Sequence, residues 1–509
     1  MEKLDNPGKD IGKNFTQIPK IATGILGLDD VAEGGFPQGR ATLIAGTSGS
    51  AKTIIGVQFI NTGINQYNQN GVFVTFEESP QDIVRNVKSF GWDLDLYEKE
   101  NKLAFVDVSP EAEARPIESG EYDFSALLAR IESAIKKVNA KRVVIDSIGS
   151  IFSQFVDATL VRRELFAIST SLKEMEVTAI ITSERSNEYG EVARFNVEEF
   201  VADNVVILRN SLEEEKRRRT IEVLKFRGSS HQKGEYPFTI SSNGVEVLPL
   251  SSMQLTQKST TTRISTGNKE LDMMCGGGFF RDSTILVSGA TGTGKTLMVT
   301  RFLDDGSRSG EKTLVFAFEE SREQLLRNAQ GWGMDFTEWE KKGLLKIICV
   351  YPESLGLEDH LLKMKKEIEH FAPSRIAVDS LSALERVSSV KSFREFVIVL
   401  TSFIKEKQSA GLFTAVTNSL MGGTSVTETH ISTTTDSIIL LRYVELMGEM
   451  RRGLAVLKMR GSMHDKLIRE YNIDGRGMHI GNPFCNVGGI LAGSPVQFTR
   501  SDMFSGNSK

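Results

Sequence analysis

The sequence predicts an α/β fold made of two tandem copies of one unit, each a mostly parallel sheet flanked by helices. A series of landmark residues recurs in the same order, at offsets of 233 to 243 residues, along a chain of 509 residues, which indicates an internal duplication. Apolar runs of strand length alternate with segments of helical spacing. In each copy a glycine-rich loop joins such a run to a helix. This alternation predicts parallel strands connected by helical crossovers.

The duplication involves polar residues as well as apolar ones. Core packing alone would repeat apolar positions, so repeated carboxylates indicate a repeated site. The offset falls by nine residues between the second and third matches. We therefore expect an insertion in the first copy, within the loop-like segment Glu111 to Tyr122. The matches are Thr23-Gly24 with Thr266-Gly267 (offset 243), Glu77-Glu78 with Glu319-Glu320 (242) and Asp146-Ser147 with Asp379-Ser380 (233).

The elements of the first copy can be assigned in order. Ala41 to Ala45 is an apolar run that ends in the glycine-rich loop, and Val72 to Phe76 also has strand composition. Residues 127–138 carry Leu, Ile and Val at helical spacing. Arg142 to Ile145 then predicts a buried strand that ends at Asp146. Ligands of such sheets bind beyond the carboxyl ends of the strands, where the glycine-rich loop and this aspartate fall.

The domain organisation follows from the repeat. We expect a first domain over residues 1–248, a linker over 249–263, a second domain over 264–495 and a short tail over 496–509. The linker assignment depends on a run rich in Ser, Thr and Gln with little apolar content. Each domain is long enough to bury a core of its own.

Composition narrows the class of protein. The net charge of −5, from 61 basic and 66 acidic residues, argues against a protein that coats nucleic acid. Cys275, Cys349 and Cys485 form no closely spaced pair, which fits a reducing compartment and neither a disulfide framework nor a zinc site. The polar N-terminus resembles no secretory signal, and no stretch reaches the roughly 20 apolar residues that span a bilayer. We expect a cytoplasmic protein without a membrane segment.

The second copy contains a complete phosphate-binding loop. The pattern GxxxxGK[ST] follows an apolar run, Thr284 to Val287, and precedes the helical pattern Leu297 to Leu303. Glycines let backbone N–H groups converge on phosphate oxygens at the helix N-terminus. Lys295 is expected to reach the outer phosphates and Thr296 to ligate Mg²⁺. The alternative is a glycine-rich turn without a ligand. The loop residues are Gly289, Ala290, Thr291, Gly292, Thr293, Gly294, Lys295 and Thr296.

The first copy contains a variant of the same loop. Ala51 stands where the pattern requires glycine, although Lys52 and Thr53 are intact. A Cβ at this position costs little if the residue is helical, and more if the phosphates need the space. We expect ATP binding here too, and the alternative is a decayed structural repeat. The loop residues are Gly46, Thr47, Ser48, Gly49, Ser50, Ala51, Lys52 and Thr53.

Repeated acidic residues suggest a metal and a base. Asp146 and Asp379 each end an apolar strand, where a carboxylate can hold the hydration shell of Mg²⁺ beside the loop threonine. The alternative role is a helix N-cap. The Glu77-Glu78 and Glu319-Glu320 pairs also follow strands, where a carboxylate can orient or deprotonate an attacking hydroxyl. Adjacent acids on a solvated turn would be the ordinary alternative.

Two sets of cations follow β-rich runs late in each copy. Cations this far from the loop in sequence could serve the γ-phosphate of a neighbouring subunit. An exposed basic hairpin explains them equally well. The sets are Lys225, Arg227 and His231 in the first copy, and Lys458, Arg460 and His464 in the second.

Two phosphate loops in parallel α/β units predict tandem P-loop domains of the RecA-like type. From about Thr23 to Pro495 the chain resembles the KaiC family of cyanobacterial circadian-clock ATPases and autokinases. Specific strings carry this resemblance: Gly234 to Ile240 (GEYPFTI), Val161 to Phe166 (VRRELF) and His430 to Thr433 (HIST).

The resemblance implies a double-ring homohexamer with ATP and Mg²⁺ between subunits, and roles for individual residues. It implies that Ser432 and Thr433 are autophosphorylation sites, near the matching Thr427 and Glu428. The first ring would hydrolyse ATP slowly with Glu77 and Glu78, and the second would phosphorylate these hydroxyls. Roles implied in the second ring are Glu319 as base and metal neighbour with Glu320 beside it, Arg386 as a cation supplied across the interface, and Lys458 and Arg460 as γ-phosphate sensors; Lys225, Arg227 and His231 would serve the first ring.

The chain departs from the family pattern at Ala51 and in its tail. Residues 496–509 are few and polar and show no amphipathic helical pattern. We therefore do not expect a KaiA-like partner, and we expect either a non-clock relative or a KaiA-independent one. A KaiB-like partner remains compatible with the first ring. The alternatives to an autokinase are a hexameric ATPase scaffold without autokinase activity and a RecA-like DNA-dependent ATPase. The acidic balance and the lack of a basic arm argue against the DNA-dependent enzyme.

Overall fold

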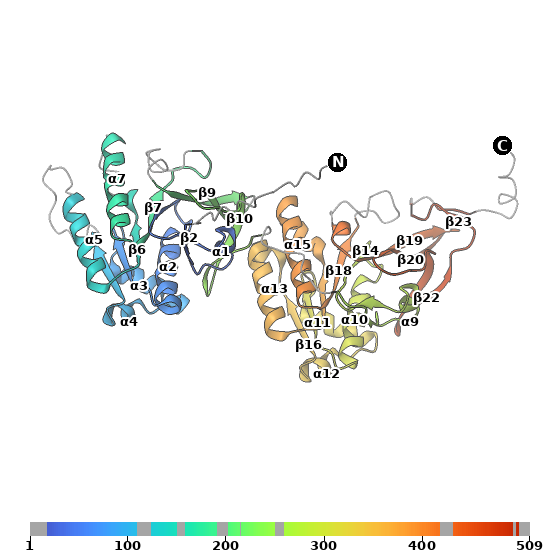
Figure 1. Ribbon diagram of the computed structural model, residues 1–509. Helices are drawn as coiled ribbons and strands as arrows, with labels where there is room; N and C mark the ends of the chain where they lie inside the picture. Colours follow the sequence, from blue (N-terminus) through green and yellow to red (C-terminus); the bar gives the residue numbers. More distant parts are fainter. Residues whose placement is uncertain are drawn as a thin grey trace, which may run out of the picture. The chain divides into compact units, whose positions relative to one another are not determined.

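The computed structural model describes residues 18–108, 124–149, 158–190, 202–213, 215–249, 259–417, 431–491 and 495–497. The chain divides into two compact units, Met1–Ser252 and Met253–Lys509, and each is described by itself (Figure 1). The insertion expected within Glu111 to Tyr122 lies outside the described residues, as do residues 250–258 of the expected linker.

The first unit contains a nine-stranded sheet of order β11-β10-β9-β8-β3-β7-β6-β4-β5. The six strands from β8 to β5 run parallel, and β9, β10 and β11 extend the sheet antiparallel beyond β8. A two-stranded sheet pairs β1 (Lys20–Ile21) with β2 (Phe36–Pro37). The strands of the large sheet are β3 (Ala41–Gly46), β4 (Gly71–Thr75), β5 (Leu103–Asp107), β6 (Arg142–Asp146), β7 (Thr178–Glu184), β8 (Asn204–Glu213), β9 (Lys216–Phe226), β10 (Glu235–Ser241) and β11 (Gly244–Val247).

Helices cover both faces of this sheet, because the side chains of each strand alternate between two apolar layers. Ile44 of β3 packs in one layer with Phe59 of α2. Its neighbour Leu43 packs in the other layer with Ile131 of α5. The helices are α1 (Leu28–Val31), α2 (Lys52–Tyr67), α3 (Pro80–Val87), η1 (Lys88–Phe90), α4 (Leu94–Lys99), α5 (Phe124–Val138) and α7 (Ala158–Glu174).

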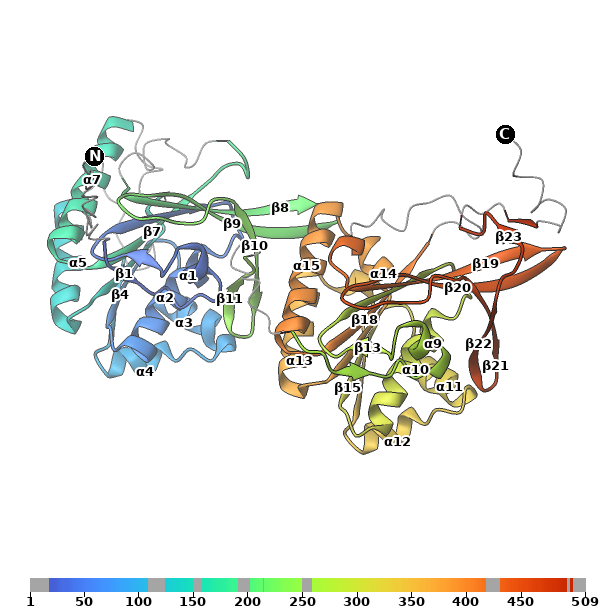
Figure 2. The same ribbon diagram turned by 45° about the vertical axis from the view of Figure 1, so that its right-hand side comes forward.

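The second unit repeats this topology with the order β16-β15-β17-β18-β14-β19-β20-β21-β22. Its long β19–β20 hairpin is visible in Figure 2. Two small sheets pair β12 (Arg263–Ile264) with β13 (Phe279–Phe280), and β23 (Val487–Gly488) with β24 (Val496–Gln497). The strands of the large sheet are β14 (Thr284–Gly289), β15 (Thr313–Ala317), β16 (Leu345–Cys349), β17 (Arg375–Asp379), β18 (Ala410–Val416), β19 (Ser437–Leu446), β20 (Glu449–Met459), β21 (Arg469–Asp474) and β22 (Gly477–Pro483).

The strands and helices expected from the sequence occur in both units. The runs beginning at Ala41, Val72, Arg142 and Thr284 lie in β3, β4, β6 and β14. The prediction of an α/β fold with two tandem RecA-like units is therefore confirmed. The helices of the second unit are α9 (Lys269–Met274), α10 (Lys295–Arg308), α11 (Arg322–Gly331), α12 (Phe336–Lys341), η2 (Pro352–Ser354), α13 (Leu357–Phe371), α14 (Leu381–Glu385), α15 (Val390–Glu406) and η3 (Ile431–Thr433).

A buried arginine in each unit ties a central strand to the helix that follows the glycine-rich loop. Arg142 of β6 is fully buried and donates from Nη1 to the Phe59 carbonyl of α2 at 2.7 Å. Arg375 of β17 repeats this contact with the Phe302 carbonyl of α10 at 3.0 Å. A Cβ on Gly63 of α2 would lie 2.4 Å from the Arg142 side chain, so this helix position requires glycine. The contact fixes each helix, and therefore its N-terminus, against the sheet.

The sequence predicted no membrane-spanning segment. In the described part of the chain, no helix combines the length and apolar character that a bilayer crossing needs.

Candidate nucleotide sites

The complete loop joins β14 to the N-terminus of α10. Gly292 and Gly294 adopt positive φ angles of 80° and 95°, a region that favours glycine. A Cβ on Gly294 would lie 2.7 Å from Ile473 Cδ1, so glycine is required there on two grounds. Lys295 Nζ donates to the carbonyls of Gly289 and Ala290 at 2.8 and 2.9 Å. Burial lowers the pKa of this lysine.

The residues of this loop suit an anionic ligand. The loop opens at a helix N-terminus, where N–H groups and the helix dipole favour phosphate. The Lys295 ammonium is largely buried and is bound to loop carbonyls. A phosphate group is a better partner for a buried cation than neutral carbonyls, because a charge-assisted hydrogen bond is about twice as strong as a neutral one.

The variant loop joins β3 to α2 and keeps the same shape. Ala51 occupies the N-cap of α2 with φ 74° and ψ 23°, almost the conformation of Gly294 in the second unit. Ala51 is therefore not helical, and a left-handed alanine costs about 1–2 kcal/mol. Lys52 Nζ donates to the carbonyls of Gly46 and Thr47 at 3.0 and 3.1 Å, as its counterpart does.

The structure joins each loop threonine to its predicted aspartate. Thr53 Oγ1 donates to Asp146 Oδ2 at 2.6 Å, and Thr296 Oγ1 donates to Asp379 Oδ2 at 2.7 Å. A second threonine, Thr414 in the second unit, donates to the other carboxylate oxygen at 2.5 Å. Burial raises the pKa of Asp379, and hydrogen bonds from these threonines oppose that shift. A hydroxyl beside a carboxylate is a donor set that suits hydrated Mg²⁺.

The glutamate pairs lie next to these aspartates. Ser147 Oγ donates to Glu77 Oε1 at 2.7 Å in the first unit. Ser380 Oγ donates to Glu319 Oε2 at 3.0 Å in the second. In both units the serine follows the aspartate directly in the chain, which explains why Asp-Ser recurs as a pair.

The second glutamate of each pair is held from the following helix. Asn86 donates to Glu78 Oε2 at 3.1 Å, and Asn328 donates to Glu320 Oε2 at 3.2 Å. Burial is the main cause of a raised pKa at Glu77 in the first unit and at Glu320 in the second. Raised carboxyl pKa values beside a phosphate loop are typical of functional sites.

Arg386 contacts a glutamate of its own unit. It caps the C-terminus of α14, and its Nη2 donates to Glu319 Oε1 at 2.6 Å. The side chains of Arg386 and Glu319 are 60% and 39% exposed, so the contact is a surface ion pair. A role of Arg386 across a subunit interface remains a prediction.

The late cations of the first unit do not converge on its own phosphate loop. Lys225 pairs with Val205 of β8, which pairs with Leu43 of β3. Gly46 begins the loop three residues further along β3, or roughly 10 Å at 3.3 Å per residue. Lys225 Nζ donates to the carbonyl of Ala202, which precedes β8. These cations therefore lie at the end of the sheet where the parallel strands begin, opposite the end that carries the phosphate loop.

Arg227 and His231 lie in the same region of the first unit. Arg227 Nη1 approaches Asp203 Oδ1 at 3.6 Å. Burial lowers the pKa of His231, whose ring packs against Phe226 with centroids 5.4 Å apart. Its Nδ1 is buried without a hydrogen-bond partner among the residues that the structure describes.

The second unit repeats this arrangement and adds the candidate acceptors. Lys458 Nζ donates to the Thr435 carbonyl at 2.7 Å, and Arg460 Nη2 to the Thr433 carbonyl at 2.8 Å. Thr433 ends η3, the short helix before β19. Since Ser437 at the start of β19 pairs with Ile285 at the start of β14, η3 lies at the edge opposite the phosphate loop.

Ser432 belongs to the same turn, η3. The matching positions Thr427, Glu428 and His430 lie outside the described residues. The structure therefore brings the backbone of the candidate acceptor turn together with Lys458 and Arg460, and it does not bring that turn to the loop of the same unit.

Sequence reasoning missed three side chains that support the loops. Arg219 Nε donates to the Gly49 carbonyl at 3.1 Å. Glu188 Oε1 accepts from Thr47 Oγ1 at 2.7 Å. In the second unit Tyr471 donates to the Thr293 carbonyl at 2.5 Å. Arg219 had a signal, since an arginine recurs at position 452 with the offset of 233 residues. The other two contacts depend on tertiary pairing and had none.

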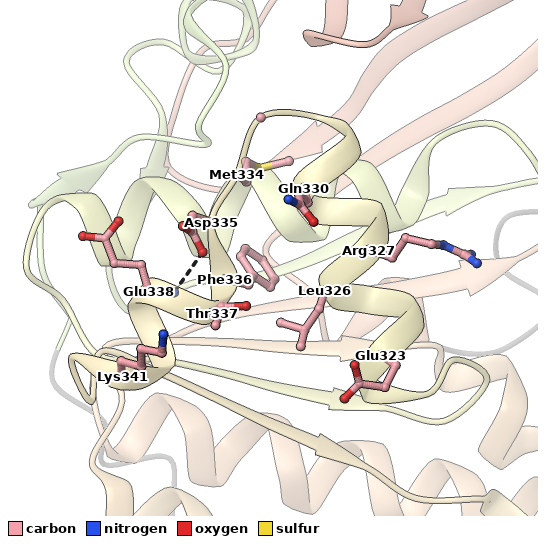
Figure 3. Close-up of a pocket in the computed structure, with 11 residues that line it drawn as sticks. Glu323, Leu326, Arg327, Gln330, Met334, Asp335, Phe336, Thr337, Glu338 and Lys341 are labelled. Carbon is pink, nitrogen blue, oxygen red and sulfur yellow. Dashed lines mark hydrogen bonds between the residues drawn. The ribbon is translucent and has the colours of Figure 1, made fainter.

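A separate hollow of about 710 Å³ lies between α11 and α12 of the second unit (Figure 3). Its walls mix acidic, basic and apolar groups and include no phosphate-loop or candidate catalytic residue. It is lined by Glu323, Leu326, Arg327, Gln330, Gly333, Met334, Asp335, Phe336, Thr337, Glu338 and Lys341.

Two RecA-like units, each with a phosphate loop, a threonine–aspartate pair and a glutamate pair, define a tandem P-loop ATPase. The family model described as "ATPase: KaiC" matches residues 21–252 and 264–483. The chain therefore belongs to the KaiC family of ATP-binding ATPases.

Curated relatives agree with this assignment. The chain is 62% identical over 487 residues to the circadian clock protein KaiC3 of Synechocystis sp., covering 96% of each chain. It is 56% identical over 490 residues to the circadian clock oscillator protein KaiC of Acaryochloris marina, covering 96% of this chain and 94% of the relative. For the KaiC of Synechococcus elongatus the identity is 54% over 482 residues, covering 95% and 93%.

Proposed function

We propose that the protein is an ATP-dependent Ser/Thr autokinase with a slow ATPase activity, acting as a homohexameric clock or signalling hub. One observation carries the proposal: the acceptor turn and its cations lie at one edge of the second unit's sheet, and the phosphate loop lies at the other. A head-to-tail ring would bring the loop of one copy against the acceptor turn of the next. The high identity to circadian clock proteins supports the clock role.

The chemistry of transfer would be shared between two copies. Glu319, held by Ser380, would accept the proton of a Ser432 or Thr433 hydroxyl of the adjacent copy. That oxygen would bond to the γ-phosphorus of ATP while the bond to the bridging oxygen breaks and ADP leaves. Lys295 of one copy, with Lys458 and Arg460 of the next, would neutralise the developing charge. Positioning and charge neutralisation supply most of the rate in such transfers.

Mg²⁺ would be held by the loop threonine and the neighbouring aspartate in each unit. The pairs are Thr53 with Asp146 and Thr296 with Asp379, each already joined by a hydrogen bond. The ion would supply charge neutralisation at the outer phosphates. Glu319 accepts a hydrogen bond from Ser380, the residue that follows Asp379 in the chain. This position fits a supporting role for the Glu319 carboxylate near the metal.

The first unit would hydrolyse ATP with Glu77 and Glu78. Glu77 would orient a water molecule, since it is held by Ser147 and is close enough to Lys52 to interact with it electrostatically. Lys225, Arg227 and His231 of a neighbouring copy would complete this site from the opposite sheet edge. By family resemblance, a KaiB-like protein would be the partner of this unit.

A hexameric ATPase scaffold without autokinase activity is the second candidate. The observation that favours it is the ion pair between Arg386 and Glu319, because it occupies the carboxylate that would act as base. The autokinase requires this pair to open or to reorient when the neighbouring copy docks.

Incubation with γ-labelled ATP, followed by mass spectrometric mapping, separates these functions. The autokinase predicts label on Ser432 or Thr433, and loss of that label in Glu319→Gln. Glu77→Gln serves as the matched control and should keep the label while it lowers phosphate release. Phosphate release without labelled protein would refute the autokinase and favour the scaffold.

A further inference from the structure

The two phosphate loops rest on different supports, and the support of the second loop is a tyrosine. Tyr471 lies in β21, is 1% exposed, and donates from its phenol to the Thr293 carbonyl at 2.5 Å. Thr293 is itself fully buried, and its hydroxyl donates to the Ala290 carbonyl at 2.7 Å. Two residues at the turn of the loop are thus linked, through one phenol, to the antiparallel extension of the sheet.

The neighbours of Tyr471 reinforce this support. A Cβ on Gly294 would lie 2.7 Å from Ile473 of the same strand and 3.2 Å from Met478 of β22. The hairpin of β21 and β22 is therefore in close contact with the residue that begins α10. Thr293 and Gly294 directly precede Lys295, so a shift of the hairpin would move the backbone that carries the lysine.

The first unit lacks this phenol. Phe238 occupies the matching position in β10, since it pairs with Val247 as Tyr471 pairs with Ile480, at the offset of 233 residues. Ser50, the counterpart of Thr293, has a buried hydroxyl without a hydrogen-bond partner in the described part of the chain. The first loop is held instead by Glu188, whose carboxylate accepts from the Thr47 hydroxyl at 2.7 Å and from the backbone N–H of Asn210 at 2.8 Å.

From this difference we infer that Tyr471 is a positioning residue for the nucleotide of the second unit, acting through Thr293 on the phosphate loop. The inference rests on ATP binding by the family and does not require the proposed autokinase activity. A buried phenol with a short hydrogen bond to a loop carbonyl fixes the direction of that peptide group. The N–H groups that follow it are those that face phosphate in such loops.

Photolabelling of the full chain with 8-azido-ATP, followed by peptide mapping, tests the inference in each unit separately. Tyr471→Phe removes one hydrogen bond and little volume. A buried hydrogen bond contributes about 0.5–1.5 kcal/mol, which corresponds to about a 2- to 10-fold rise in half-saturating nucleotide. We expect this rise for peptides of the second unit, while peptides of the first unit keep their wild-type half-saturation.

Tyr97→Phe is the matched control. Tyr97 is also a buried tyrosine, and its phenol donates to Asn61 Oδ1 at 2.9 Å without touching a phosphate loop. It should lower stability by a similar amount and leave both half-saturations unchanged. If Tyr471→Phe lowers the melting temperature as Tyr97→Phe does but leaves second-unit labelling unchanged, Tyr471 is merely structural and the inference is wrong.

Discussion

Thr296 Oγ1 donates a 2.7 Å hydrogen bond to Asp379 Oδ2, and Thr53 repeats this contact on Asp146 at 2.6 Å. The pairs join residues 83 and 93 positions apart in the chain. Each pair links the residue after the loop lysine to the end of a central strand. The threonine–aspartate contact is thus repeated in both units, and in the second unit burial of the aspartate opposes its ionisation.

This burial predicts a gain in stability when the charge at Asp379 is removed. Burial raises the pKa of Asp379, so the folded state keeps a proton that the unfolded state has lost. Stability therefore falls as pH rises from the unfolded value, about 3.9, through the raised value. In protein free of metal and nucleotide, Asp379→Asn should therefore be more stable than wild type. The gain should grow as pH rises from about 4 and should level off above the raised pKa.

Calorimetry across that pH range checks this prediction. Asp335→Asn removes an exposed charge and keeps a good N-cap for α12, so it should show no such growth. If Asp379→Asn is less stable than wild type at pH 8, burial of the ionised Asp379 carboxylate does not destabilise the folded state, and the prediction is wrong. The same variant should lose Mg²⁺-dependent ATP turnover in the second unit.

Ala51 predicts a second stabilising substitution. Relief of the left-handed conformation gains about 1–2 kcal/mol, and the greater freedom of glycine in the unfolded chain returns about 0.4–1 kcal/mol. Ala51→Gly should therefore stabilise the first unit by about 0.8 kcal/mol, the difference between the midpoints of these two ranges. Hydrogen exchange at the amides of α2 should slow accordingly.

Ala372→Gly is the control for this substitution. Ala372 is also left-handed, with φ 50°, but it caps α13 in the second unit. It should give a similar gain there without slowing exchange in α2. The reverse change, Gly294→Ala, should destabilise the second unit, because the added Cβ meets Ile473. Faster hydrogen exchange in α2 of Ala51→Gly would contradict the claim that the left-handed conformation of Ala51 is strained.

Arg386 should matter for transfer and hardly for stability. Its ion pair with Glu319 is partly exposed, and such pairs contribute about 0–1 kcal/mol. Arg386→Ala should shift the melting temperature by less than about 3 °C. Labelling of Ser432 and Thr433 should fall at least about 10-fold, because the pair opens when the neighbouring copy docks and Arg386 then neutralises charge on the transferred phosphoryl group. Arg322→Ala removes a comparable exposed pair with Glu340 and should keep the label. Unchanged labelling in Arg386→Ala would show that Arg386 has no part in transfer and that its ion pair with Glu319 is only a surface contact.

The pH dependence of phosphate release should follow Glu77. Burial, together with Glu184 and Asp146, raises the pKa of Glu77, and a water-orienting base must be ionised. In a Glu319→Gln background, phosphate release should rise with pH through this raised value. Glu184→Gln removes one nearby negative charge and should move the rise to lower pH. A profile that stays flat from pH 4.5 upwards would argue against Glu77 as the base.

The sequence predicted what repeats and missed what is particular to one unit. Strands such as β3 and β6 were predictable because their apolar runs end at Gly46 and Asp146. The chemistry of the loops was predictable because phosphate binding requires glycine, lysine and threonine at fixed spacing. The left-handed N-cap of Ala51 was not, since one alanine in a motif does not reveal its φ angle.

The supports of the loops also escaped prediction. Tyr471 lies 178 residues from Thr293, and Glu188 lies 141 residues from Thr47. Contacts between such distant residues depend on how β21 and the segment after β7 pack, which no local pattern records. The sequence also could not predict at which end of the sheet Lys225 and Lys458 lie, because that depends on the register of β9 and β20.

Mixed assemblies test most directly the claim that transfer occurs between copies. Chains carrying Glu319→Gln and chains carrying Ser432→Ala with Thr433→Ala are co-expressed with different affinity tags, purified through both tags, and given γ-labelled ATP. Neither chain should label itself when expressed alone. Transfer between copies predicts label on Ser432 or Thr433 of the Glu319→Gln chain in the mixed assembly. An unlabelled mixed assembly beside a labelled wild type would contradict it.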